Sequence, residues 1–304
     1  MKYAISGGAG FIGSNVVDTL IDESHEVVIF DNFSSGKREN INPKAKLVEV
    51  DLSDPNSSNI LIRELKDVHT VFHFAAMARV QPSIDEPVPF EINNTISTIN
   101  LLKSAVDAQV KRFVYSASSS AYGNAIKMPM KEDDPTNPIS PYAMQKFYGE
   151  VACKMFAQVY NIETVSLRYF NVYGERQSME GAYALVVAAF AKKRMNGEPL
   201  TIRGDGEQRR DFTYVKDVVR ANILASQSKS VGNGEVINIG NGDNKSVNDI
   251  ARLIGGETIT VDPVVEPRET LADNSLAKSL LNWEPSMNLE DWIPQYKKDC
   301  GIDE

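Results

Sequence analysis

The stretch SGGAGFIGSN, residues 6–15, decides the fold of this chain. Gly8, Gly10 and Gly13 stand in G-x-G-x-x-G spacing, and Gly7 gives a second three-residue register. This pattern is typical of a tight turn whose backbone approaches a pyrophosphate at the N-terminus of a helix. An apolar run precedes the stretch and a helical pattern follows it, which is the context the motif requires. The stretch therefore predicts a dinucleotide site in preference to a plain tight turn.

The segment EVVIFDN, residues 26–32, supplies an acidic side chain about 20 residues after the glycine loop. Asp31 ends this apolar run and can accept hydrogen bonds from both hydroxyls of the adenosine ribose. It would also repel a 2′-phosphate, so it favours NAD over NADP. Lys37 and Arg38 follow closely and could soften that exclusion, although a solvated loop is the simpler interpretation of them.

Short apolar runs alternate with amphipathic stretches through the first half of the chain. We expect strands at 3–6, 26–30, 46–50, 70–75, 112–118 and 164–170, and helices at 11–22, 57–66, 91–108 and 141–160. Such alternation predicts βαβ units around a buried parallel sheet. The expected fold class is α/β, a doubly wound (Rossmann) parallel sheet. Residues 1–170 would form the NAD-binding domain, and residues 171–304 mainly a smaller, interleaved substrate-binding lobe, with some later segments returning to the first domain.

Composition narrows the classes of partner. The chain has 304 residues and 42% apolar residues, enough for a sizeable core, and its net charge of −9 argues against a nucleic-acid surface. No apolar run approaches the ~20 residues that would cross a bilayer. Cys153 and Cys300 suggest neither a disulfide framework nor a metal site, and the amino terminus does not resemble a targeting signal. We expect a cytoplasmic protein without a metal.

Three polar residues are expected at one crevice. SASSSAYG, residues 116–123, ends the fifth expected strand, and the carboxyl ends of such strands face the ligand. Tyr142 and Lys146, in SPYAMQK, are four positions apart on a helix and share one face. A neighbouring ammonium and the positive nicotinamide would both lower the pKa of the tyrosine from its ordinary value near 10, so that it could act as a base. Ser118 could then relay the proton of a substrate alcohol.

These motifs, together with HFAAMA at 73–78 and RYFNVYG at 168–174, resemble the extended short-chain dehydrogenase/reductase family. Within it the chain is similar over nearly its full length to the NAD-dependent nucleotide-sugar 4-epimerases of the UDP-glucose 4-epimerase type. The RQ then GAYA pattern within residues 168–187 resembles the branch that acts on UDP-N-acetylhexosamines. The resemblance implies reversible interconversion of UDP-GlcNAc and UDP-GalNAc, or of UDP-Glc and UDP-Gal, through a transient 4-keto sugar. It also implies a homodimer formed by the helices near 91–108 and 141–160.

The resemblance implies a role for individual residues, with Ser118, Tyr142 and Lys146 catalytic. The NAD-binding residues would be Gly7, Gly10, Phe11, Ile12, Gly13, Asp31, Asn32, Asp51, Leu52, Phe74, Ala75, Ala76, Asn94, Tyr142, Lys146 and Phe170. The UDP-sugar would be bound by Ser118, Tyr142, Asn171, Leu185, Val186, Arg203, Arg210, Arg268 and Thr270. Among these, Arg203 could stack on the uracil and Arg210 could pair with the diphosphate.

The sequence departs from the family pattern at two places. The family usually has an arginine in a turn about seven residues ahead of the position of Thr270, where this chain has Pro263, so either Arg268 takes over that phosphate or binding is altered. Thr270 itself often corresponds to a bulky tyrosine when only UDP-glucose is accepted, so an N-acetyl group could enter here.

Two alternatives remain open at this level. A nucleotide-sugar 4,6-dehydratase or a reductase could use the same core, although the dehydratases carry an acidic triplet where this chain has Ser118, Ser119 and Ser120. A non-catalytic NAD-binding regulator could keep the fold, although the intact serine, tyrosine and lysine set argues against it.

Overall fold

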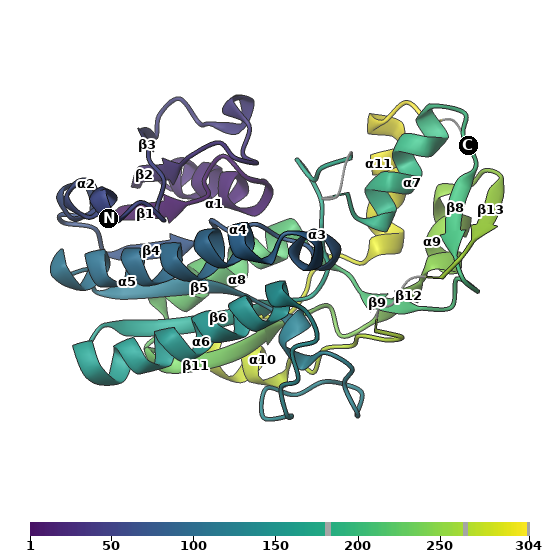
Figure 1. The fold of residues 1–304 in the computed structure, drawn as a ribbon. Coiled ribbons are helices and arrows are strands. Elements are labelled where there is room, and N and C mark those ends of the chain that lie inside the picture. The colour runs from purple at the N-terminus through teal and green to yellow at the C-terminus, as the bar shows by residue number, and fades with distance from the viewer. Residues whose placement is uncertain (180–183, 264–266, 303–304) are drawn as a thin grey trace.

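The main sheet has seven parallel strands in the order β11-β6-β5-β4-β1-β2-β3 within the residues that the computed structural model describes, 1–179, 184–263 and 267–302 (Figure 1). Its strands are β1 (Lys2–Ser6), β2 (Glu26–Asp31), β3 (Lys46–Glu49), β4 (Thr70–His73), β5 (Arg112–Ser118), β6 (Glu163–Tyr169) and β11 (Asn233–Ile239). The order reverses between β1 and β4, which is the switch point of a doubly wound sheet. The predicted fold class is therefore confirmed, and each predicted strand lies within two residues of its observed ends.

Helices cover both faces of this sheet. One layer contains α1 (Phe11–Asp22) and α8 (Val215–Gln227), and the other contains α2 (Ser58–Glu64), α5 (Ser97–Asp107) and α6 (Pro141–Tyr160). Strand side chains alternate between the layers because successive residues of a strand point to opposite faces. In β1, for example, Tyr3 and Ile5 pack with the α1 layer, whereas Ala4 packs with the α5 layer.

Helix α6 has clear sequence reasons for its ends. Its N-cap is Ser140, whose hydroxyl accepts a hydrogen bond from the Ala143 amide at 3.2 Å, and Pro141 occupies the first helical position. It ends at Asn161, whose φ of 57° is the left-handed conformation that commonly terminates helices. These signals place Tyr142, the second residue of the helix, at the carboxyl ends of the strands.

The predicted helix over 91–108 begins at the wrong residue, and it is not one regular α-helix. The chain is already helical in α4 (Pro87–Glu91), passes through a π-helical turn at Ile92–Ile96, and continues as α5. Asn94 lies in that turn, and its side chain binds both the backbone N–H and the carbonyl of Met77. A π-turn inserts one extra residue into a helix. The spacing of apolar residues does not indicate such an insertion, so the turn could not be predicted from that spacing.

The second part of the structure lies beside the carboxyl ends of the main strands (Figure 1). Its helices are α7 (Val186–Met195), α9 (Val247–Ile254) and α11 (Leu289–Asp299), and its strands include β8 (Leu200–Arg203), β9 (Arg209–Asp211), β12 (Asn244–Ser246) and β13 (Thr258–Val261). β13 pairs with β8 in parallel, and β12 pairs with β9 in antiparallel fashion. The remaining elements are α3 (Val80–Asp85), α10 (Ser275–Leu281), β7 (Val172–Tyr173) and β10 (Thr213–Tyr214).

Residues from both halves of the chain share one apolar cluster. Ile5 and Val17 of the main sheet and α1 belong to it, as do Phe190, Ile250 and Trp292 of the second part. β11 also returns to the main sheet, where it pairs with β6 in parallel. Within the described ranges, none of the helices is both long and apolar enough for a membrane span.

Candidate active site

A cleft of about 1020 Å³ opens at the carboxyl ends of the main strands, where the second part of the structure forms its other wall. The predicted site residues that line it are Gly7, Gly10, Phe11, Ile12, Gly13, Asp31, Asn32, Asp51, Leu52, Phe74, Ala75, Ala76, Ser118, Tyr142, Lys146, Asn171, Leu185, Arg203, Arg210 and Thr270. Residues chosen from segments far apart in the chain thus meet in one cavity. Its position, outside the carboxyl ends of the strands at the switch point, is where doubly wound sheets bind ligands.

The glycine loop between β1 and α1 forms one end of this cleft. Gly7 has a φ of 71°, and a Cβ there would lie 2.7 Å from the Ala75 nitrogen. A Cβ on Gly13 would lie 2.2 Å from the Gly7 carbonyl oxygen. Gly10 is the N-cap of α1, so the free N–H groups of the helix start face the cleft. Side chains at Gly7 and Gly13 would therefore collide with neighbouring backbone atoms. A glycine loop of this kind lets the backbone approach a pyrophosphate closely.

Two carboxylates lie beside this loop. Asp31 is buried, and its two oxygens accept hydrogen bonds from the backbone N–H groups of Ala9 at 2.9 Å and Phe33 at 2.8 Å. Burial alone would raise the pKa of Asp51, but hydrogen bonds from Ser53 and Asn32 outweigh it and hold the pKa below its ordinary value. These bonds fix the orientation of both carboxylates toward the end of the cleft where an adenosine would lie.

Ser118, Tyr142 and Lys146 meet where β5 ends and α6 begins. The Tyr142 backbone N–H donates to the Ser83 hydroxyl at 3.1 Å, which fixes α3 against the start of α6. The Lys146 ammonium is buried and donates to the Ser116 carbonyl at 2.8 Å. The Ser118 hydroxyl oxygen accepts from the Ser120 amide at 3.2 Å and from the Ser120 hydroxyl at 2.9 Å. Its own proton is therefore directed away from Ser120, and its hydrogen bond with Tyr142 lowers the pKa of that phenol.

The predicted effect of Lys146 on Tyr142 is wrong. Burial raises the pKa of Tyr142 above its ordinary value of 10.0, and the two opposing influences are the hydrogen bond with Ser118 and the positive charge of Arg79. Lys146 instead directs its ammonium at the Ser116 carbonyl, and burial lowers its pKa to about 8 against the attraction of Glu150. Among the described residues, the positive charge of Arg79 favours the phenolate.

Sequence reasoning missed Arg79, which lines the cleft after β4 and precedes α3. Its φ of 106° is unusual for a residue with a side chain and marks a strained backbone next to the site. The available signal was its position directly after the HFAAMA motif. Arg79, Lys146, Arg203 and Arg210 are the basic residues of the lining, and its carboxylates are Asp31, Asp51 and Asp85, so the lining is nearly balanced in charge although the chain has a net charge of −9.

Four predicted site residues do not line the cleft. Asn94 is buried and binds Met77 and Gln145, and Phe170 is buried in a small cluster with Tyr122, Met130 and Ala272. Val186 packs against the main apolar cluster at the start of α7.

Arg268 points elsewhere, because both of its terminal nitrogens bind the Asp205 carboxylate, at 2.8 and 2.9 Å, on an exposed surface. Its neighbour Pro267 lines the cleft instead. Pro263, which stands where the family usually has an arginine, lies against Gly204 in the turn after β8. The first three residues of the GAYA tetrapeptide, 181–183, lie outside the described residues.

Comparison with known proteins agrees with this geometry. The model of the NAD dependent epimerase/dehydratase family matches residues 3–240. A UDP-glucose 4-epimerase from Thermotoga maritima, solved with UDP-glucose, is 38% identical, with a TM-score of 0.92 over 98% of this chain and 99% of that one. A UDP-N-acetylglucosamine 4-epimerase from Methanobrevibacter ruminantium, solved with UDP-N-acetylmuramic acid, is 35% identical, with a TM-score of 0.90 over 98% of each chain.

A third similar structure is a UDP-glucuronic acid 4-epimerase from Bacillus cereus, solved with UDP-glucuronic acid and NAD. It is 31% identical, with a TM-score of 0.89 over 99% of each chain. The agreement covers the glycine loop, the main sheet and the second part of the structure together. This chain belongs to the NAD dependent epimerase/dehydratase family.

Proposed function

We propose that this protein is an NAD-dependent 4-epimerase of UDP-hexoses. The observation that carries the proposal is the shared cleft: Ser118, Tyr142 and Lys146 lie between a glycine loop suited to a pyrophosphate and a wall that carries Arg203 and Arg210. Relatives of similar length and fold are epimerases of UDP-glucose, UDP-N-acetylglucosamine and UDP-glucuronic acid, which supports the same reaction here.

In this proposal each of the three residues has a separate task. Tyr142 takes the proton of the C4 hydroxyl, and Ser118, which hydrogen bonds to it, relays or shares that proton. Arg79 favours the negative charge that forms on the phenol. Lys146, buried and held by the Ser116 carbonyl, would bind the ribose next to the nicotinamide.

The residues present fit NAD. The glycine loop leaves no room for side chains between its backbone and Ala75, and the Asp31 and Asp51 carboxylates lie at the end where an adenosine would bind. NAD held by the glycine loop, Asp31 and Asp51 would supply the hydride acceptor and donor for C4 of the sugar. The protein holds the nucleotide diphosphate while the keto sugar turns over, and residues 1–170 chiefly bind NAD while residues 171–304 chiefly bind the UDP-sugar.

Substrate preference depends on the wall opposite the glycine loop. The guanidinium of Arg210 suits the diphosphate, and the planar group of Arg203 suits stacking on uracil. Thr270 lines the cleft where a larger side chain would exclude bulky sugars. We therefore expect UDP-GlcNAc to be accepted together with UDP-Glc.

The test is incubation of the purified protein with UDP-GlcNAc, UDP-Glc and UDP-glucuronic acid, followed by mass spectrometry and proton NMR. We expect a product of unchanged mass that is epimeric at C4, without net formation of NADH. A product lighter by one water would instead identify a dehydratase. Net oxidation or reduction of added cofactor would identify a reductase. Bound NAD that never becomes reduced when a UDP-sugar is added would indicate a non-catalytic regulator.

We propose that the protein forms a homodimer through α5 and α6. Met144, Tyr148, Val151, Met155 and Val159 are exposed and recur every three or four residues along α6, so they form one apolar stripe. Ile92 and Ile96, in the π-helical turn that precedes α5, are also exposed, and both this turn and α5 pack against α6. A patch of this kind matches a two-fold interface in which the same surface faces itself.

Val151→Glu should convert the dimer into monomers, because it would place two carboxylates in the apolar interface. Light scattering coupled to size-exclusion chromatography measures this mass. The matched control is Ile126→Glu, which changes an exposed residue outside the stripe and should leave the dimer intact. A wild-type protein that is monomeric at all concentrations, or a Val151→Glu variant that stays dimeric, would contradict the interface.

We also propose that the reaction takes place in the cytoplasm. Cys153 and Cys300 are both free thiols, and Cys153 is buried, which suits a reducing compartment. Localisation of a fluorescent fusion, or fractionation of the source cells, tests this directly.

A further inference from the structure

Asp211, at the end of β9, is a buried carboxylate that has no role in the proposed reaction mechanism. Its side chain is fully buried. The carboxylate accepts hydrogen bonds from three backbone N–H groups: Asn241 at 2.7 Å, Gly242 at 3.0 Å and Ala272 at 3.0 Å. Asn241 and Gly242 follow β11, whereas Ala272 belongs to the segment after Thr270. One carboxylate therefore joins two segments to β9.

The backbone of Asp211 makes two further contacts, both with residues that line the cleft. Its N–H donates to the Thr270 hydroxyl at 3.3 Å, and its carbonyl accepts from the Asn171 side chain at 3.1 Å. Arg210 precedes it on β9 and, because side chains alternate along a strand, points to the opposite side. Three cleft residues from three separate segments thus meet around Asp211.

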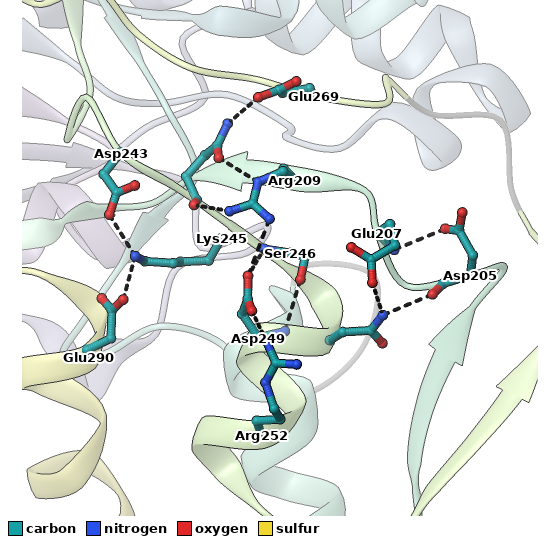
Figure 2. Close-up of polar contacts among 12 residues, drawn as sticks. Asp205, Glu207, Arg209, Asp243, Lys245, Ser246, Asp249, Arg252, Glu269 and Glu290 are labelled. Atoms are coloured by element: carbon teal, nitrogen blue, oxygen red, sulfur yellow. Dashed lines mark hydrogen bonds and ion pairs between the residues drawn. The ribbon is translucent and has the colours of Figure 1, made fainter.

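Arg209, also on β9, joins this strand to β12 and to the segment of residues 268–270. Arg209 binds both the side-chain and the backbone oxygen of Asn244 on β12, at 2.7 and 2.8 Å. Figure 2 shows Arg209 between Asp249 and the segment that carries Glu269. The Arg209 backbone also exchanges hydrogen bonds with Arg268 and Thr270, at 2.9 and 3.1 Å. This frame fixes β9, and the Asp211 carboxylate then fixes the two adjoining segments to it.

We propose that Asp211 is a positioning residue for nucleotide-sugar binding: its buried carboxylate holds the segment of Thr270 and the turn after β11 against β9, so that Arg210, Asn171 and Thr270 face the UDP-sugar together. The inference rests on the proposed function only in naming the UDP-sugar as the ligand. It assigns Asp211 an effect on substrate affinity, and leaves the proton transfer at Tyr142 and the binding of NAD unaffected.

The chemistry explains why a carboxylate is needed at this place. Two oxygens with several lone pairs can accept three N–H groups, whereas an asparagine offers one acceptor oxygen and would direct its own N–H₂ at backbone donors. Burial raises the pKa of Asp211 to about 6, although the Ala272, Asn241 and Gly242 amides oppose this. The group is therefore mainly ionised at about pH 8, where all three bonds are charge-assisted.

The test compares Asp211→Asn with the wild-type holoenzyme at about pH 8, where the wild-type carboxylate is ionised. We expect KM for the UDP-sugar and Kd for UDP, measured by calorimetry, to rise about tenfold or more, as the loss of a buried hydrogen-bonding group predicts. The value of kcat and the content of bound NAD should change little. Asp243→Asn is the matched control, because Asp243 is exposed on the neighbouring turn and should keep wild-type KM.

A second variant keeps the inference testable if Asp211→Asn does not fold. Thr270→Val removes the hydroxyl that accepts the Asp211 N–H and preserves the shape, so it should raise KM for the UDP-sugar and Kd for UDP several-fold. Wild-type KM and Kd in both variants would overturn the inference, and so would losses of kcat and bound NAD at unchanged KM. A wild-type protein that binds UDP but performs no epimerisation would overturn the proposed function alone, because the UDP affinities of the variants would still report on Asp211.

Discussion

Tyr142→Phe should lower kcat about 10²–10⁴-fold, the contribution typical of a positioned acid–base group. The substitution removes a single hydroxyl from the start of α6 and leaves the ring in place. The N-cap at Ser140 and the bond from the Tyr142 backbone to Ser83 do not involve that hydroxyl, so the helix should keep its position. Initial rates at saturating UDP-sugar, followed by NMR of the C4 epimer, measure the change.

Tyr160→Phe is the matched control for this experiment. Tyr160 ends the same helix and is exposed, so loss of its hydroxyl should leave kcat at the wild-type value. The bound NAD and the thermal unfolding midpoint of Tyr142→Phe should equal those of the wild type. Turnover by Tyr142→Phe within a few-fold of the wild type would mean that another group takes the C4 proton.

Arg168→Met should cost about 3–5 kcal/mol of unfolding free energy, because it leaves a buried carboxylate without its partner. Arg168 on β6 and Glu150 on α6 are each only 3% exposed. Two parallel hydrogen bonds of 2.8 Å join them, and the guanidinium also lies 4.5 Å from the centre of the Tyr122 ring. The pair fastens α6 to β6 one helical turn beyond Lys146. Urea unfolding followed by circular dichroism gives the free energy.

Two comparisons sharpen this experiment. Lys103→Met breaks an ion pair with Asp107 in which both side chains are well exposed, so its loss should stay below about 0.5 kcal/mol. The double variant Arg168→Met with Glu150→Leu should regain most of the stability, since a buried ion pair replaced by apolar side chains is often close to neutral. An Arg168→Met variant as stable as Lys103→Met would contradict the proposed cost of an unpaired Glu150.

The parts of the fold that depend on local sequence pattern were predictable from the sequence. The glycine loop, the apolar runs and the bounds of α6 each follow from neighbouring residues, and all three appear where expected. The pairing of β11 with β6 is different, because it joins segments that are distant in the sequence. No local sequence pattern indicates which later strand will pair with the edge strand of a sheet. The π-turn at Ile92–Ile96 was missed for a related reason, since its cause is the contact of Asn94 with Met77.

The sequence motifs predicted which residues line the site, because they fix the course of the backbone. They did not predict which hydrogen-bond or ion-pair partner each side chain would have. The spacing of the motifs correctly predicted that Ser118, Tyr142 and Lys146 would line one cleft. It could not tell that the ammonium would turn to the Ser116 carbonyl or that Arg79 would act on the phenol. The same limit explains Arg268, which the sequence offers as a phosphate ligand and which instead binds Asp205.

The position of β11 has a consequence for how the protein is made. A ribosome must translate beyond Ile239 before β6 acquires its outer neighbour. Until then the nascent chain carries an open row of backbone amides and carbonyls, on which other chains can assemble. A fragment that stops at Phe170 therefore keeps this strand edge unpaired, and we expect it to aggregate more readily than the full chain.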